Sequence, residues 1–109
     1  MNVIGKVSGR TVVICDDMID TAGTLVETAR VLRKKRAARV LACATHAVLS
    51  GPAIDRLRKT PLEEIITTNT VPVNGSRILP NLKSLSVASL FAKAIRSIHE
   101  ETSISNLFV

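Results

Sequence analysis

Short apolar runs alternate along this chain with segments of helical periodicity, and this alternation restricts the fold more than any other feature. The run 11–15 is rich in β-branched residues and lies between Gly9 and Asp16, so it predicts a strand that is buried on both faces. The other predicted strands, on the same grounds, cover residues 39–45, 64–67 and 83–87. The predicted helices cover residues 24–35, a segment that Ser50 caps, and residues 88–100.

Strands that alternate with helices form βαβ units and therefore a parallel sheet. We predict one α/β domain over residues 1–109, with a mostly parallel four-stranded sheet, helices on both faces and one uncovered edge. Aromatic residues make up only 2% of the chain, so the core is expected to be aliphatic. The last predicted helix carries an apolar stripe of Val87, Phe91, Ala94, Ile95 and Ile98.

The apolar runs also restrict the location of the chain. None approaches the roughly 18 residues that a membrane-spanning helix needs, and no signal peptide is visible, so we expect no membrane partner. Cys15 and Cys43 each lie inside an apolar run, which is typical of buried, reduced thiols in a cytosolic protein. We therefore predict a cytoplasmic protein without a cysteine-based metal site.

The net charge of +6 suits anionic ligands but decides little by itself. Basic residues gather at the end of the first predicted helix, where the helix dipole favours them: Arg30, Arg33, Lys34, Lys35, Arg36 and Arg39. No aromatic residues interleave with them, so the chain does not offer base stacking. We expect no nucleic-acid partner.

Residues 12–24 combine a strand, an acidic pair and the start of a helix. Ligands of open parallel sheets bind beyond the carboxyl ends of the strands, which is where this segment lies. The first amide N–H groups of a helix have no partner within it, and the dipole adds partial positive charge, so a phosphate suits this end. Gly23 would let an oxygen approach the backbone closely, while Thr21 and Thr24 would add hydroxyl donors.

Carboxylates have a different role at such a site. Asp16 and Asp17 are adjacent in the strand, so only one of them faces the ligand unless the chain turns there. Carboxylates accept hydrogen bonds from sugar hydroxyls, or bind Mg²⁺ that a diphosphate carries. A ligand with an anionic end and a polyol end meets both demands. We predict a sugar-phosphate site made of Asp16, Asp17, Asp20, Thr21, Ala22, Gly23 and Thr24.

A purely structural interpretation accounts for part of this pattern. Thr24 and Glu27 have the spacing of a capping box, and Asp20 suits a turn or a helix start. Capping does not account for two further acids at the strand end, nor for Gly23. We therefore favour the ligand site.

The same residues carry a resemblance to a known family. Residues 12–24 resemble the phosphoribosyl pyrophosphate signature of the type I phosphoribosyltransferase fold. The form Asp-Asp-Met-Ile-Asp-Thr-Ala-Gly-Thr-Leu resembles more specifically the ribose-phosphate diphosphokinases, also called phosphoribosyl pyrophosphate synthetases. Essentially the whole chain is similar to the C-terminal domain of that family, including residues 45–46, 50–53, 68–72, 92–99 and 103–108.

The resemblance implies an activity and its ligands. The family transfers the β,γ-diphosphoryl group of ATP to the 1-hydroxyl of ribose 5-phosphate, with Mg²⁺, to give phosphoribosyl pyrophosphate and AMP. By resemblance, residues 20–24 would hold the 5-phosphate. Asp16 and Asp17 would meet the ribose hydroxyls or, indirectly, the metal ion.

The resemblance also implies regulation by ADP or phosphate, through residues near the C-terminus. These correspond to Ser103, Ser105 and Phe108. Asn106 stands where the family has an aromatic residue before its final Leu-Phe, so the chain departs from the pattern there.

The family is much longer than this chain, and its N-terminal domain supplies the ATP pocket and the catalytic basic residues. We therefore expect this chain to bind ribose 5-phosphate without turnover, to carry no catalytic residue, and to form homo-oligomers as the family does. His46 is expected at the lip of the pocket rather than as a general base. Two alternatives stay open: a phosphoribosyltransferase, or a non-catalytic regulatory subunit of the synthetase.

Overall fold

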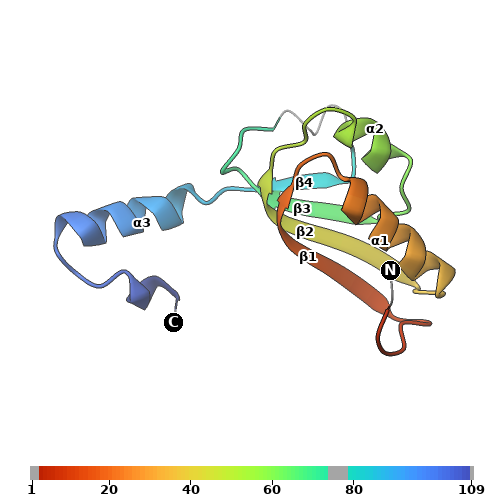
Figure 1. The fold of residues 1–109 in the computed structure, drawn as a ribbon. Helices are drawn as coiled ribbons and strands as arrows, with labels where there is room; N and C mark the ends of the chain where they lie inside the picture. Colours follow the sequence, from red (N-terminus) through yellow and green to blue (C-terminus); the bar gives the residue numbers. More distant parts are fainter. Residues whose placement is uncertain (1–2, 74–78, 109) are drawn as a thin grey trace.

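A parallel sheet forms the centre of the molecule. The computed structural model describes residues 3–73 and 79–108. Within them, the strands β1 (Thr11–Ile19), β2 (Arg39–Ala47), β3 (Glu64–Thr68) and β4 (Leu82–Leu85) lie in the order β1-β2-β3-β4, and each pairs in parallel with its neighbour (Figure 1). The predicted four-stranded parallel sheet is confirmed.

Two helices connect the strands on one side of this sheet. Helix α1 (Gly23–Lys34) joins β1 to β2, and α2 (Ala53–Arg58) joins β2 to β3; the two helices contact each other (Figure 1). Parallel crossovers are almost always right-handed, so two crossovers that step in the same direction put their helices on the same face. The prediction of helices on both faces is therefore wrong, because it needs a strand order that reverses direction.

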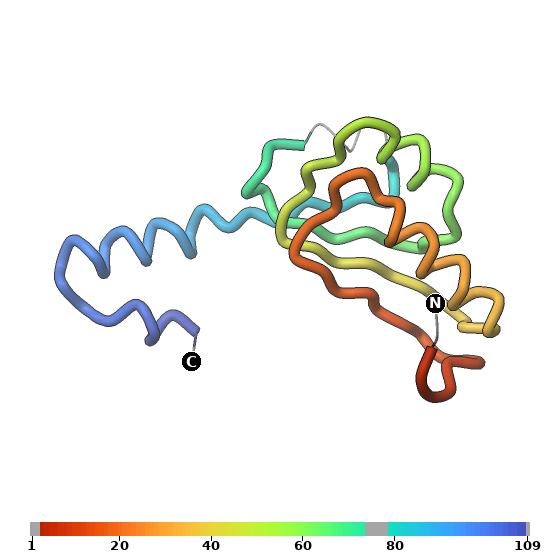
Figure 2. Tube along the Cα trace, viewed as in Figure 1, coloured from red at the N-terminus to blue at the C-terminus, as the bar shows by residue number. Residues whose placement is uncertain are grey.

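The third helix does not cover the opposite face. Helix α3 (Ala88–His99) extends away from the sheet, and the 3-10 turn η2 (Ser105–Phe108) lies beside it (Figures 1 and 2). The apolar stripe predicted from its periodicity is present but not packed: Phe91 is 54% exposed and Ile95 is 65% exposed. In the described part of the chain, no helix is long and apolar enough to cross a bilayer.

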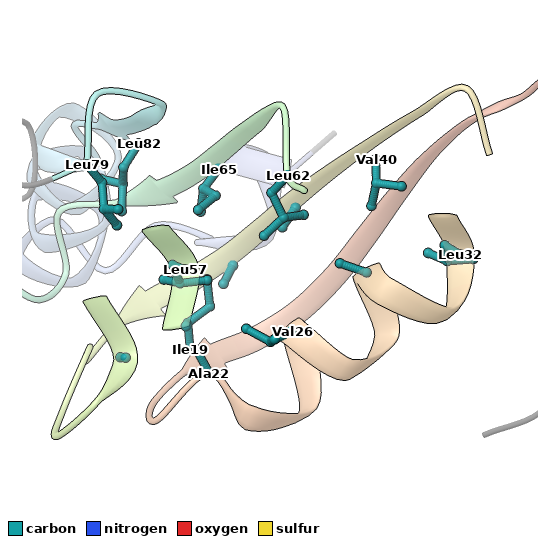
Figure 3. Packing of buried hydrophobic residues seen from close by; sticks show 14 of the residues in the cluster. Ile19, Ala22, Val26, Leu32, Val40, Leu57, Leu62, Ile65, Leu79 and Leu82 are labelled. Atoms are coloured by element: carbon teal, nitrogen blue, oxygen red, sulfur yellow. The ribbon is translucent and has the colours of Figure 1, made fainter. Parts of the chain in front are cut away.

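The core lies between the sheet and the α1–α2 layer, and it is aliphatic as predicted. Val40, Leu57, Ile65 and Leu79 are its largest fully buried apolar side chains (Figure 3). Burial of one such side chain stabilises the fold by about 1.5–3 kcal/mol. This packing fixes the positions of the loops at the carboxyl ends of the strands.

The uncovered face of the sheet also carries apolar side chains. Val12 and Ile14 pack against the core, so by alternation Val13 and Cys15 point to the other side, where both are exposed. Cys43 on β2 is half-buried. The prediction that both cysteines are buried is wrong, because it assumed a sheet covered on both faces.

Core packing predicts how a matched pair of substitutions affects stability. Ile65 has no exposed surface, whereas Ile4 is 98% exposed. Ile65→Ala is expected to lower the free energy of unfolding by about 2–5 kcal/mol, because it removes buried methylene groups and leaves a cavity. Ile4→Ala is expected to change it by less than about 0.5 kcal/mol. Urea denaturation measures both, and equal losses would contradict the assignment of the core.

Candidate functional site

A cleft of about 170 Å³ opens at the carboxyl end of β1. The predicted residues that line it are Asp16, Asp20, Thr21, Ala22, Gly23 and Thr24. Asp17 is the one predicted ligand-binding residue outside its lining. The rest of the wall is formed by apolar residues of β1, by Leu25 of α1, and by Ala42 and Cys43 of β2. The structure thus brings residues 20–24 and one member of the acidic pair to a common cavity.

The loop that closes this cleft is short and strained. Strand β1 runs to Ile19 rather than ending at residue 15 as predicted, which leaves only residues 20–22 before α1. Ala22 takes a left-handed conformation with φ 66°. For a residue other than glycine this costs on the order of 1–2 kcal/mol. Its methyl group is buried beside Ile19 in the core, and this packing holds the chain in the strained turn.

The strained turn places the N-terminus of α1 at the cleft, and no side chain caps this end of the helix. Ala22 is the N-cap residue. The predicted capping box of Thr24 and Glu27 does not form, because the helix begins one residue early and Thr24 lies within the first turn. The first turn contains no acidic residue. Its first backbone N–H groups have no acceptor within the helix, so they can donate to an anion in the cleft.

Gly23 lines the cleft and also lies against Arg56 of α2. The residue with positive φ is its neighbour Ala22. A Cβ at Gly23 would lie 3.2 Å from Nη1 of Arg56, which is closer than a comfortable contact. The missing side chain therefore leaves room for the Arg56 guanidinium, while the close approach of a ligand oxygen to Gly23 stays a prediction.

Two residues that sequence reasoning did not assign to the site hold the loop from outside. Arg56 of α2 donates from Nη1 to the carbonyl oxygen of Thr21, at 3.1 Å. The hydroxyl of Ser50 donates to the carboxylate of Asp20, and the Ser50 N–H donates to the Asp20 carbonyl at 3.0 Å. Ser50 was expected to cap the second helix, but the N-cap of α2 is Pro52. The resemblance over residues 50–53 was the only sequence signal for this contact.

The acidic pair is split as the alternation of a strand requires. Asp16 lines the cleft and accepts a hydrogen bond from the Asp17 N–H at 2.8 Å. The hydrogen bond with the Asp17 side chain, and then that with the Asp17 backbone, hold the pKa of Asp16 below its ordinary value. Asp16 is therefore a carboxylate at neutral pH and an acceptor for hydroxyl groups.

His46 is held at the end of β2 and does not line the cleft. Its Nδ1 lies 2.8 Å from the hydroxyl oxygen of Thr70, and that hydroxyl also donates to the Thr45 carbonyl at 3.2 Å. These contacts join β2 to the segment that follows β3. They do not place the imidazole against Asp16.

Comparison with known proteins identifies the family. The family model described as the phosphoribosyl synthetase-associated domain matches residues 1–109. The chain belongs to this family.

Curated relatives and a solved structure agree with this assignment. The chain is 56% identical over 109 residues to the ribose-phosphate pyrophosphokinase of Synechococcus elongatus, a match that covers 99% of the chain and 33% of the relative. It is 49% identical to the corresponding protein of Clostridium acetobutylicum, over 99% of the chain and 34% of the relative. It thus spans about a third of the length of the curated relatives it matches.

The fold is similar to that of the phosphoribosylpyrophosphate synthetase from Mycobacterium smegmatis in its crystal structure. The two share 43% sequence identity with a TM-score of 0.86, over 90% of this chain and 33% of that one. The four-stranded sheet and its cleft are therefore built on a fold that this family uses.

The C-terminal residues named by the resemblance lie apart from the cleft. The hydroxyl oxygens of Ser103 and Ser105 are 2.6 Å apart, and Phe108 is exposed. All three follow α3, which extends away from the sheet (Figure 1). The structure does not bring them together with residues 20–24, so a regulatory role for them stays a prediction.

The cleft has limited capacity for a metal ion. Among the described residues, no group of three or more His, Cys, Asp and Glu side chains could hold one. Mg²⁺ is commonly bound by one or two carboxylates together with substrate phosphates and water. The ionised Asp16 in the cleft suits that arrangement as one ligand, and Asp17 would act on the metal only through Asp16.

The hydrogen bonds to Asp16 predict its titration. Because they favour the charged form, its carboxyl midpoint, followed by ¹³C NMR, is expected below 3.8. The stabilisation from this charge is then present above pH 3.8 and is lost as the pH falls through the lowered pKa. A midpoint at or above 3.8 in the unmodified chain would contradict this interpretation.

Proposed function

We propose that this chain is the C-terminal, sugar-phosphate-binding part of a ribose-phosphate diphosphokinase. One observation carries the proposal: the uncapped N-terminus of α1 opens into the same cleft as the Asp16 carboxylate. One end of the cleft suits an anion, and the other suits hydroxyl groups. Ribose 5-phosphate has both kinds of group at the required ends.

In the proposed complex, the 5-phosphate accepts hydrogen bonds from the first amides of α1 and from the hydroxyls of Thr21 and Thr24. Small residues support this, because Ala22 and Gly23 leave the amides accessible from the cleft. Asp16 accepts hydrogen bonds from the ribose hydroxyls. Asp20 is fixed by Ser50 and faces the same cavity, where it is a second acceptor.

The proposed reaction belongs to the whole protein. The 1-hydroxyl of ribose 5-phosphate loses its proton to solvent, and its oxygen forms a bond to the β-phosphorus of ATP. The bond from that phosphorus to the α,β-bridging oxygen breaks, and AMP leaves with that oxygen. ATP and Mg²⁺ would be bound with the help of residues outside this chain. The names of the relatives support the diphosphokinase over a phosphoribosyltransferase. We expect this chain to bind and orient the sugar without turnover, in the cytoplasm, and we retain ADP or phosphate as its proposed regulators.

The contacts of the ribose and of the phosphate can be tested separately. Ribose 5-phosphate is expected to shift the amide NMR signals of residues 16–24. Asp16→Asn removes a charged acceptor and is expected to weaken ribose 5-phosphate binding by about tenfold or more. It should leave the affinity for inorganic phosphate unchanged, since the phosphate contacts the other end of the cleft.

Asp55→Asn is the matched control, because Asp55 is an exposed carboxylate on α2 outside the cleft lining. It should leave both affinities unchanged. If ribose 5-phosphate leaves the signals of residues 16–24 unmoved, the proposed site is wrong.

We also propose that the chain self-associates, with a second copy covering the apolar surface of α3. This surface consists of exposed apolar residues on one helix: Leu90, Phe91, Ile95 and Ile98. Contiguous exposed apolar surface commonly marks a protein interface. Light scattering is expected to give at least twice the 11.7 kDa mass of one chain. Phe91→Glu with Ile95→Glu should reduce the mass to that of one chain, whereas Lys93→Glu on the same helix should not. A single-chain mass for the unmodified protein at every concentration would exclude this contact.

A further inference from the structure

The two cysteines of the chain meet on the uncovered face of the sheet. Cys15 on β1 and Cys43 on β2 are direct partners in the parallel register. Their sulfur atoms are 3.2 Å apart, and the Cys43 thiol donates to the Cys15 sulfur. Cys15 is exposed and Cys43 is half-buried. The chain has 2 cysteines in all, so no third thiol competes with this pair.

We propose that Cys15 and Cys43 form a dithiol site that low-molecular-weight disulfides oxidise to an intramolecular disulfide. Neighbouring strands of a sheet lie about 4.8 Å apart, which is within the range of Cα separations that disulfides span. Because the residues are direct partners and point to the same face, rotation of the side chains can close the remaining gap. The backbone does not need to change its pairing.

The two thiols have different roles in the proposed step. Cys15 is exposed, so its thiolate attacks one sulfur of glutathione disulfide; a Cys15–glutathione bond forms and one glutathione thiolate leaves. The Cys43 sulfur then loses its proton and attacks the Cys15 sulfur, which releases the second glutathione. The protein loses two protons and two electrons, and one glutathione disulfide is reduced to two molecules of glutathione.

The local chemistry supports this order. The hydrogen bond to Cys15 and then burial raise the pKa of Cys43, so at neutral pH Cys43 remains a thiol until the mixed disulfide has formed. The Cys15 sulfur accepts that hydrogen bond while it remains open to solvent on the uncovered face. Cys15 is therefore the entry point, and Cys43 is the resolving thiol.

The dithiol site lies next to the cleft at the carboxyl end of β1. Cys15 directly precedes Asp16, and Cys43 lines the cleft itself. A bond between the two sulfurs would fix β1 to β2 one residue before the carboxylate that faces the cavity. The proposal concerns disulfide formation, and it stands whether or not the cleft binds ribose 5-phosphate.

Mass spectrometry of the dilute, folded chain after treatment with glutathione disulfide tests the proposal. The unmodified protein is expected to lose two hydrogens, carry no glutathione, and regain its mass with dithiothreitol. Cys43→Ser should accumulate one glutathione on Cys15, because no second thiol resolves the mixed disulfide. Cys15→Ser should be modified at least about tenfold more slowly, since the remaining thiol is half-buried.

A denatured sample provides the control for geometry. In urea the sulfurs are no longer neighbours, so the mixed disulfide of the unmodified chain should persist long enough to be trapped by acid, whereas in the folded chain it should not accumulate. Three results would overturn the proposal: glutathione that accumulates on the folded protein, disulfides only between chains, or equal accumulation of the mixed disulfide in folded and denatured samples.

Discussion

The burial of the Ala22 methyl group in a left-handed turn is the constraint on which the candidate site depends. Its contact with the core at Ile19 holds the backbone in a conformation that alanine ordinarily avoids. Because of it, three residues suffice to turn the chain from β1 into α1, and the helix starts with an uncapped N-terminus over the cleft. Two hydrogen bonds from the connection between β2 and β3 also hold the turn. Ser50 donates to the Asp20 carboxylate, and Arg56 donates to the Thr21 carbonyl. The aliphatic core thus maintains the geometry of a polar site.

Much of the architecture follows from local sequence patterns. The apolar runs predict four strands and the periodic segments predict α1 and α3, because burial on a sheet or on one helix face requires just these spacings. The predicted ends are less accurate at β1, where Asp16 and Asp17 continue a strand that the apolar pattern ends at residue 15. Polar side chains can continue a strand when its backbone is paired with a neighbouring strand, as β1 is with β2. The pattern of apolar residues within one segment does not contain that pairing.

The remaining differences arise from contacts between distant residues. Which face a helix covers depends on the order of the strands, and the order β1-β2-β3-β4 puts α1 and α2 together on one side. Arg56 reaches the loop across 35 residues of sequence, so no local motif contains it. The cysteine pair arises in the same way, from a register between β1 and β2 that brings two sulfurs together on the uncovered face. The loop 20–24 was predictable because its residues are consecutive.

A crystal structure of the chain with ribose 5-phosphate tests the central claim most directly, because it records the orientation of the ligand. The account predicts phosphate oxygens within hydrogen-bond distance of the backbone nitrogen atoms of Gly23 and Thr24, with the ribose hydroxyls directed toward Asp16. A sugar phosphate bound in the reverse orientation, or with its phosphate on the basic surface of α1 near Arg30 and Lys34, would contradict it.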